Sequence, residues 1–426
     1  MLRGWRLSTL LMERTILALL LVLSLALIFP TFSAGQLVLG QYEDEAPLRT
    51  WNIFGFPTGA SLGRGETSFA VPAADPATAL SNPALLTDMS GLRLTLNGMA
   101  MSTSLRRFSI INTGVLATEG NIFLNLYGVD MAGLSFSRGG WGVAFNVYLA
   151  EIYDRPPTEY EYSYRGQLYY KIKFNQDGLL RIYHLSLARK MGPAGRIRAG
   201  IGFNIARGDL HRKIEEEWAA NGIVISDSKS QEFSGFFING GVAVQLTEKL
   251  LLAAVARTPY QKNSPGESEL IYDAPAGGVD ISITASATSR YKQPLVVGLG
   301  ASYLVSPRLR LSADVSFFNW ASYRVEYFEE ELERHFRNTV KAGLGGEFVV
   351  PCRFFGREAA IPLRLGIIRD EQPMKELPSA YTLLSAGAGF HCGVIRLDLG
   401  ASAGSEKGSG DSLEARRIAL SLTLGF

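Results

Sequence analysis

Few stretches of the chain carry residue types that could do chemistry. The glycine-rich run from Gly59 to Gly65 is a candidate phosphate loop, but it lacks the Lys-Ser/Thr pair that reaches phosphates, and no alternating β/α pattern surrounds it. We therefore interpret it as a turn. No His-Glu-x-x-His motif occurs, so a zinc protease has no support. We expect no enzyme activity and no cofactor.

Two acidic runs and two cysteines are the remaining candidates for metal or redox chemistry. Glu215–Glu217 and Glu329–Glu331 could hold a divalent cation or bridge lipopolysaccharide through a metal, although such runs are more often simply solvated. Cys352 and Cys392 form no CxxC pair, and the four histidines are scattered, so no zinc site is expected. A Cys352–Cys392 disulfide and two unpaired thiols both remain open.

The N-terminus has the pattern of an export signal. Arg3, Arg6 and Arg14 form a basic region, and an uncharged apolar run extends from Ile16 to Phe29. That run is shorter than the ~20 residues that span a bilayer as a helix. We therefore predict a signal peptide over 1–35, with cleavage between Ser33 and Gln36.

The charge balance argues against a nucleic-acid partner. The chain carries 42 basic and 40 acidic residues, and the predicted signal peptide contains three of the first and one of the second. The mature chain is therefore neutral and has no basic run, which excludes the electrostatic footprint of a nucleic-acid-binding protein.

From Gly91 onward, apolar and polar residues alternate with a period of two, which indicates strands whose faces meet different environments. The last strand shows the pattern best, because Ile418, Leu420, Leu422, Leu424 and Phe426 share one face. Most of these segments reach the length that crosses a bilayer as a tilted strand, about 9–11 residues, whereas soluble strands average about 5–6.

The segments predict a transmembrane antiparallel β-barrel of fourteen strands over 91–426. We place them at 91–104, 122–137, 140–153, 179–190, 196–210, 234–246, 249–258, 294–305, 308–320, 338–350, 360–369, 381–391, 393–403 and 416–426. Even-numbered connections are tight, except the tenth at 351–359, and odd-numbered ones are long. Short turns on one side and long loops on the other are typical of bacterial outer-membrane barrels.

This parity sets the orientation. The tight turns, both chain ends and both cysteines face the periplasm, and the long loops face outward. A short helix near Glu215–Ala220 could cover the mouth. Outer-membrane lipids and lipopolysaccharide surround such a barrel, and the strand ending at Phe426 is expected to contact the barrel assembly machinery.

Side chains along the strands fall into two expected groups. Those on the inward face should pair with one another or with a segment in the lumen: Arg198, Arg310, Asp314, Lys341, Glu347, Arg396 and Asp398. Aromatic residues near strand ends are expected in the interfacial girdle: Trp141, Tyr148, Tyr153 and Trp320.

Residues 36–90 do not alternate, and Gly and Pro interrupt them repeatedly. The stretch is nonetheless moderately apolar, and we place it in the lumen as a hatch, because fourteen strands enclose more space than side chains fill. Phe54, Phe56 and Phe69 are candidates for an apolar pocket there.

Motifs along the chain resemble the long-chain fatty acid transporter family, the FadL/TodX group of outer-membrane proteins. They run in order over nearly the whole mature chain: Gly59–Ala70, Ala74–Pro76, Asn82–Ala84, Val297–Gly300, Leu309–Val315, Asn319–Trp320, Leu363–Gly366 and Arg369–Pro373.

The resemblance implies a fourteen-stranded barrel with an N-terminal hatch and an apolar pocket for a hydrophobic ligand. It also implies a side exit at an inward kink of the third strand, with Asn82, Pro83 and Ala84 beside it. That would make Phe145, Asn146 and Val147 the facing segment. The chain departs from the family here, because its third strand has no Pro or Gly at the expected kink.

Two functions follow from these observations. The first is passive uptake of hydrophobic small molecules, long-chain fatty acids or hydrocarbons, across the outer membrane. The second is a structural or secretion-accessory barrel that does not transport lipid. A continuous third strand and a sealed hatch would favour the second.

Overall fold

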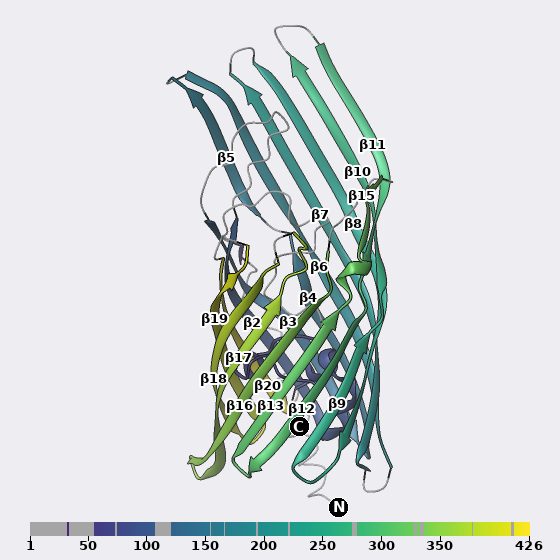
Figure 1. Ribbon diagram of the computed structural model, residues 1–426, viewed down its shortest axis with the longest axis vertical. Helices are drawn as coiled ribbons and strands as arrows, with labels where there is room; N and C mark the ends of the chain where they lie inside the picture. Colours follow the sequence, from purple (N-terminus) through teal and green to yellow (C-terminus); the bar gives the residue numbers. More distant parts are fainter. Residues whose placement is uncertain are drawn as a thin grey trace, which may run out of the picture.

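The computed structural model shows a closed antiparallel β-barrel of fourteen strands that rises into a tall extension on one side (Figure 1). It describes residues 32–33, 55–72, 75–106, 121–153, 155–165, 167–192, 195–219, 222–274, 279–327, 330–332, 336–376, 378–409 and 413–426. Most of the predicted signal peptide, and residues 36–54 of the predicted hatch, lie outside them. Within the described residues, no helix is long and apolar enough to cross a membrane.

The barrel strands follow one another around the wall, and the last pairs with the first. They are β2 (Gly91–Arg106), β3 (Asn121–Arg138), β4 (Trp141–Ile152), β6 (Gln167–Met191), β7 (Ile197–Trp218), β8 (Ile223–Gln245), β9 (Leu250–Arg257), β12 (Val296–Ser306), β13 (Leu309–Phe318), β16 (Thr339–Phe354), β17 (Arg357–Glu371), β18 (Ala380–Cys392), β19 (Ile395–Lys407) and β20 (Glu414–Gly425). Closure occurs where β20 pairs with β2, and Phe426 exchanges two backbone hydrogen bonds with Leu92.

The period-two pattern explains why these segments form a membrane wall. In β9, Leu252 points outward and is exposed, whereas Leu251, Ala253 and Val255 are buried inside. In β20 the exposed Ile418 and Leu420 alternate with the buried Ala419 and Ser421. Large apolar side chains on the outward face replace contact with water by contact with lipid, while small and polar ones fill the lumen.

The predicted strand count and order are confirmed, but two predictions about connections are wrong. The tenth connection is as tight as the others, since β16 runs to Phe354 and β17 starts at Arg357. The segment near Glu215–Trp218 is no helix, because β7 continues as a strand and pairs Trp218 with Ile223 of β8.

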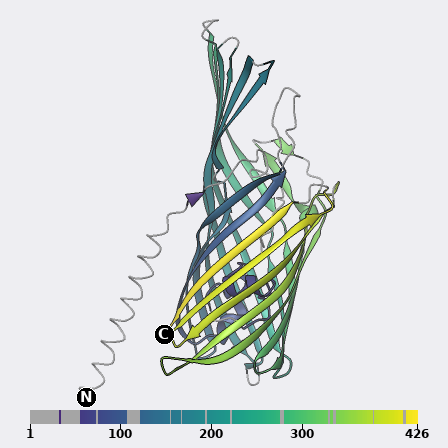
Figure 2. The same cartoon turned by 90° about the vertical axis from the view of Figure 1, so that its left-hand side faces the viewer.

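Much of the predicted outer loop sequence forms the extension seen in Figures 1 and 2. It consists of the outer parts of β6, β7 and β8 together with β5 (Arg155–Tyr164), β10 (Tyr260–Ala274) and β11 (Val279–Gln293). Pro259 and Pro294 each interrupt a strand, so that β9 continues as β10 and β11 continues as β12. Shorter elements are β1 (Phe32–Ser33), β14 (Arg324–Tyr327), β15 (Glu330–Leu332) and the 3-10 helix η3 (Trp320–Ser322).

Residues 55–72 and 75–90, called the lumen segment below, lie inside the lower half of the barrel (Figure 2). They form α2 (Gly59–Gly63), α3 (Thr78–Ser81) and the 3-10 helix η1 (Pro83–Asp88). Thr58 caps α2 in a reciprocal capping box with Ser61, and the Asn82 side chain caps η1 by accepting from the Ala84 amide.

The two cysteines are free, which matches the second of the two alternatives that the sequence left open. Cys352 of β16 and Cys392 of β18 both pair with Ala359 of the intervening strand β17. Two strand spacings of ~4.8 Å place their Cα atoms about 9.6 Å apart, beyond the ~7 Å that a disulfide tolerates.

We expect both thiols to stay reduced under oxidising conditions. The purified protein should incorporate two equivalents of maleimide reagent without prior reduction, measured by intact mass spectrometry. Labelling that requires a reductant would contradict the observed register of β16, β17 and β18.

Candidate functional site

Buried ion pairs attach the lumen segment to one side of the barrel wall. Glu66 contacts Arg417 of β20 and lies 2.7 Å from the ammonium group of Lys341 on β16. Burial alone would raise the pKa of the Glu66 carboxyl, but Arg417 and Lys341 outweigh it and hold the pKa below its usual value. Lys341 also lies 3.5 Å from Asp370 of β17.

A second network lies beside the first. Arg64 donates to Glu347 at 3.0 Å, and Arg364 of β17 bridges Glu347 and Asp398, each at 2.7 Å. His391 lies 3.0 Å from the same Asp398. Burial lowers the pKa of Arg64, and Glu347 opposes that shift.

Two more of the charged residues predicted to point inward, Arg198 and Asp314, also contact the lumen segment. Arg198 of β7 donates to Asp88 at 2.6 Å. Asp314 of β13 accepts from the backbone amides of Ser68 and Phe69 at 2.6 and 2.9 Å. The prediction that inward charges pair with the hatch is thus confirmed for Arg198, Asp314, Lys341 and Glu347.

Glycines of the wall let the lumen segment approach the strands closely. A Cβ at Gly345 would come within 2.2 Å of the Arg64 carbonyl oxygen, and one at Gly400 within 2.2 Å of the Gly59 carbonyl oxygen. At Gly200 it would come within 2.6 Å of the Ala84 amide nitrogen. These positions therefore admit no side chain without displacing the segment.

The motif Asn82-Pro83-Ala84 packs against a different part of the wall from the one predicted. Asn82 faces Gly241 of β8, and Pro83 and Ala84 face Gly200 of β7. The Asn82 amide group donates to the Phe69 carbonyl at 2.7 Å, which ties together two parts of the lumen segment.

The third barrel strand, β4, meets residues on either side of that motif. Asn146 donates to the Pro76 carbonyl at 3.2 Å, and Leu86 packs against Gly142. Of the three β4 residues predicted to face the hatch, only Asn146 does so. Phe145 is 46% exposed on the outward face, and Val147 shares that face because successive side chains alternate.

β3 and β4 separate near the outer edge of the apolar band, although β4 has no Pro or Gly there. Their pairing ends at Met131 and Tyr148, although β3 continues outward along β2, and β4 continues along β6. The register shifts leave one residue unpaired in each strand, Asp130 in β3 and Ala150 in β4. β-bulges bend strands and end pairing, so two facing bulges open the wall here.

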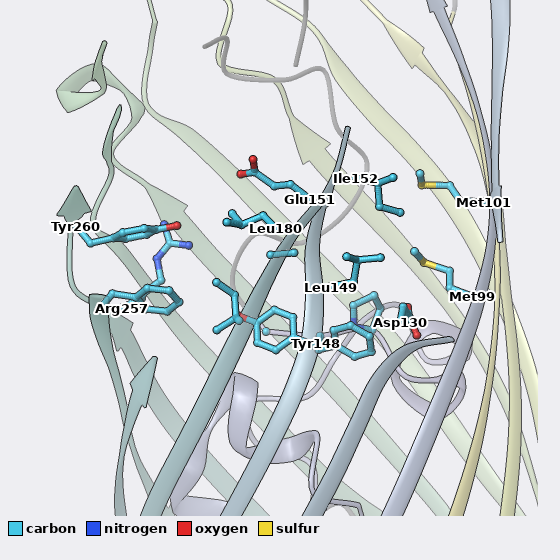
Figure 3. Close-up of a pocket in the computed structure, with 16 residues that line it drawn as sticks. Met99, Met101, Asp130, Tyr148, Leu149, Glu151, Ile152, Leu180, Arg257 and Tyr260 are labelled. Carbon is cyan, nitrogen blue, oxygen red and sulfur yellow. The ribbon is translucent and has the colours of Figure 1, made fainter. Parts of the chain in front are cut away.

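A cavity of about 80 Å³ lies directly inside this gap (Figure 3). Its wall combines residues of β2, β3, β4, β6, β8, β9 and β10 with the start of the lumen segment. The lining is Gly55, Phe56, Pro57, Met99, Met101, Asp130, Tyr148, Leu149, Ala150, Glu151, Ile152, Leu180, Ile182, Phe237, Arg257 and Tyr260.

Of the predicted pocket residues, only Phe56 lines the cavity, where it packs edge-on against Tyr148 with ring centroids 5.6 Å apart. Phe54 lies outside the described residues. Phe69 is buried elsewhere, against Gly298 and Gly300 of β12.

Three of the predicted girdle residues also turn inward. Tyr148 lines the cavity, and Tyr153 and Trp320 are buried, so only Trp141 is exposed, with the Arg189 guanidinium 4.3 Å from its ring centroid. An aromatic residue near a strand end suits either face, but alternation along β4 places Tyr148 on the inward face that it shares with Asn146.

The outer end of β4 is linked to β10, across the barrel opening, through Lys262. Lys262 of β10 lies 2.9 Å from the Glu151 carboxylate and 3.2 Å from the Tyr153 hydroxyl. Its ammonium also stands 4.6 Å from the Phe233 ring and 5.0 Å from the Tyr291 ring. Lys262, held by these cation–π contacts, binds the Glu151 carboxylate on the inner side of β4, away from β3.

The described residues include two sequences with the Gly-x-Ser-x-Gly spacing of a nucleophile elbow, Gly59–Gly63 and Gly400–Gly404. The second lies within strand β19, so it forms no strand-to-helix turn. The Ser61 hydroxyl accepts from the Thr58 amide at 2.9 Å and is engaged in the helix cap. No group of three or more His, Cys, Asp or Glu side chains in the described part of the chain is placed to hold a metal ion.

Comparison with known proteins gives structural matches only. No family model and no curated protein matches the chain. The toluene transporter TbuX of Ralstonia pickettii is 15% identical with a TM-score of 0.60, and a Pseudomonas aeruginosa FadL homologue is 16% identical with 0.61. The toluene transporter TodX of Pseudomonas putida is 13% identical with 0.62. Each match covers 88% of this chain and 99% of the other. The chain therefore has the fold of the FadL-type hydrocarbon channels, which its sequence resemblance implied.

Proposed function

We propose that this chain is an outer-membrane channel for the passive uptake of hydrophobic small molecules, namely long-chain fatty acids or hydrocarbons. The observation that carries the proposal is the cavity that lies inside the β3–β4 gap. A solute held there is shielded from the polar sugars outside and borders a break in the wall at the edge of the apolar band. The structurally similar toluene transporters TbuX and TodX support the same class of solute.

The lining suits a loosely selective apolar site. Met99 and Met101 supply flexible, polarisable surface, and Phe56, Tyr148 and Phe237 supply rings. Affinity from such a surface scales with buried area, at about 25 cal/mol per Å². An apolar cavity of ~150 Å³ holds benzene, so a solute here must displace side chains or extend into the gap.

Of the three ionisable residues in the lining, Asp130, Glu151 and Arg257, only Arg257 is a cation, and we expect it to distinguish fatty acids from hydrocarbons. Arg257 is buried, its guanidinium lies 5.8 Å from the Phe237 ring and 5.6 Å from the Tyr260 ring, and it donates to the Pro294 carbonyl at 3.1 Å. A guanidinium in an apolar wall favours a solute that carries a carboxylate.

Replacing Arg257 by Leu should therefore lower uptake of a fatty acid about 10-fold, because a hydrogen bond to a charged group contributes ~1.5–3 kcal/mol. Uptake of toluene by the same variant should stay within about 2-fold, since toluene offers no group to the guanidinium. Both rates are measured with labelled solutes in the same cells. An equal loss for both solutes would show that Arg257 holds the wall together rather than sorting solutes.

The channel itself is tested in a Gram-negative host that lacks its own fatty acid channel. Expression of the chain should increase uptake of labelled oleate or toluene above the level of the empty host. A folded barrel in the outer membrane that raises uptake of neither solute would refute the proposal and favour the structural or secretion-accessory barrel. The signal peptide, the hatch function of 36–90 and contact with the assembly machinery at Phe426 belong to the same proposal.

A further inference from the structure

Two arginines stand directly opposite each other on the outward face of the barrel. Arg181 of β6 pairs in register with Arg207 of β7, and both are exposed. Residues paired in this way have Cβ atoms about 4.5–5.5 Å apart, and like charges at that separation destabilise a sheet. The arrangement is favourable only if an anion offsets the repulsion.

No described carboxylate forms an ion pair with either guanidinium. Arg207 donates to the neighbouring Ala206 carbonyl at 3.4 Å, a long hydrogen bond that leaves the rest of its donors exposed. Two other arginines, the partly exposed Arg290 and the exposed Arg416, do have carboxylate partners, Glu326 and Glu414.

The position of the pair along the strands places it at the outer edge of the lipid-facing band. Two residues nearer the periplasm, the same face carries the row Tyr183, Ile205 and Phe236, which are 40, 46 and 54% exposed. Two residues further outward the face becomes acidic, with Asp209 opposite Glu232. Asp209 lies 3.6 Å from His211 rather than with the arginines.

A ligand that satisfies this surface carries a phosphate at the membrane boundary and acyl chains below it. Guanidinium groups bind phosphate oxygens through paired hydrogen bonds, and Ser234, opposite Arg207 on β8, adds a hydroxyl beside them. The exposed row of Tyr183, Ile205 and Phe236 then supplies the surface for the acyl chains.

We propose that Arg181 and Arg207 form a binding site for a lipid A phosphate of lipopolysaccharide. The choice of lipid follows from the side of the membrane. The pair lies toward the long extensions and away from the tight periplasmic turns, and therefore in the leaflet that lipopolysaccharide occupies. The site is independent of transport, because neither arginine lines the cavity.

The test compares the full-length wild type with Arg181→Gln/Arg207→Gln in a neutral detergent. Binding of fluorescent lipid A is titrated, and co-purified lipid A is measured by mass spectrometry. The double variant should bind about 10-fold or more weakly and retain less lipid A, since each charge-assisted contact is worth more than a factor of 10. Lipid A stripped of its phosphates should bind wild type and variant equally weakly.

The matched control removes two exposed arginines from the other rim, Arg138→Gln/Arg189→Gln, which flank Trp141 near the periplasmic turn. Its affinity for lipid A should stay within about 2-fold of wild type. Equal losses in both double variants would overturn the site in favour of general charge attraction. Phosphatidylglycerol binding as tight as lipid A binding would overturn the assignment to lipopolysaccharide.

Discussion

Replacing Ala150 by Trp is expected to lower uptake of hydrophobic solutes about 10-fold or more. Ala150 is the bulged residue of β4 and lines the cavity at the gap. An indole there fills space that the solute needs, and overfilling a packed site costs ~1–3 kcal/mol, which corresponds to roughly 5- to 150-fold in occupancy. The measurement is the initial rate of labelled oleate or toluene uptake, normalised to the folded barrel in the outer membrane.

The control for this variant is Ala256→Trp. Ala256 lies on the outward face of β9, where an added ring meets lipid rather than the cavity. Its uptake rate should equal that of wild type. If both variants transport at the wild-type rate while remaining folded, the solute does not pass through the β3–β4 cavity.

Replacing Glu66 by Gln is expected to lower the free energy of unfolding by about 3–5 kcal/mol, the cost of leaving a buried charge without its partner. Arg417 is fully buried and loses its carboxylate, whereas Lys341 keeps Asp370 at 3.5 Å. Denaturant unfolding in detergent micelles measures the change. The exposed Glu232→Gln, on the outward face of β8, is the matched control and should change stability by less than ~0.5 kcal/mol.

A second variant separates loss of the ion pair from loss of packing. Glu66→Leu/Arg417→Leu removes both charges together, and apolar replacement of a buried pair is often neutral or stabilising. We expect it to recover most of the stability. A double variant as unstable as Glu66→Gln would show that the ion pair is not what the single substitution disrupts.

The Glu66 pair also predicts a pH dependence. Because the pKa of Glu66 is lower in the folded barrel than in the unfolded chain, its contribution is fully present above about 4.5 and is lost as the pH falls through the folded pKa. Glu66→Gln should lack that part of the acid sensitivity. Asp75 acts in the opposite sense, because burial and the nearby Asp398 raise its pKa to about 6.

The sequence predicted the barrel well because alternation reports which face each strand residue occupies. The fourteen strands, their order and the inward charges all follow from that pattern. Alternation does not show where a strand ends above the membrane. The strands β6 and β7 continue to pair in the extension, at residues such as Ile172 and Ile214, in the same way as in the barrel wall. The pattern therefore predicts loops where the structure has outer hairpins.

The candidate site was harder to predict because it depends on register and on contacts distant in sequence. The bulges at Asp130 and Ala150 leave no mark in the sequence of β4, which has neither Pro nor Gly there, so a Pro or Gly kink is not a reliable indicator of the gap. The alternation rule, applied strictly, would have turned Phe145 and Val147 outward. It could not have placed Asn82 against Gly241, because that contact depends on the path of the lumen segment.

The close fit between the lumen segment and the glycines of the wall has a consequence for assembly. Backbone in contact with Gly345 and Gly400 leaves no clearance through which the segment could be threaded into a finished barrel. The segment leads directly into β2, and β2 forms the closing seam with β20. We therefore expect the barrel strands to assemble around the lumen segment. The pairing of β2 with β20, which includes Leu92 and Phe426, should form last.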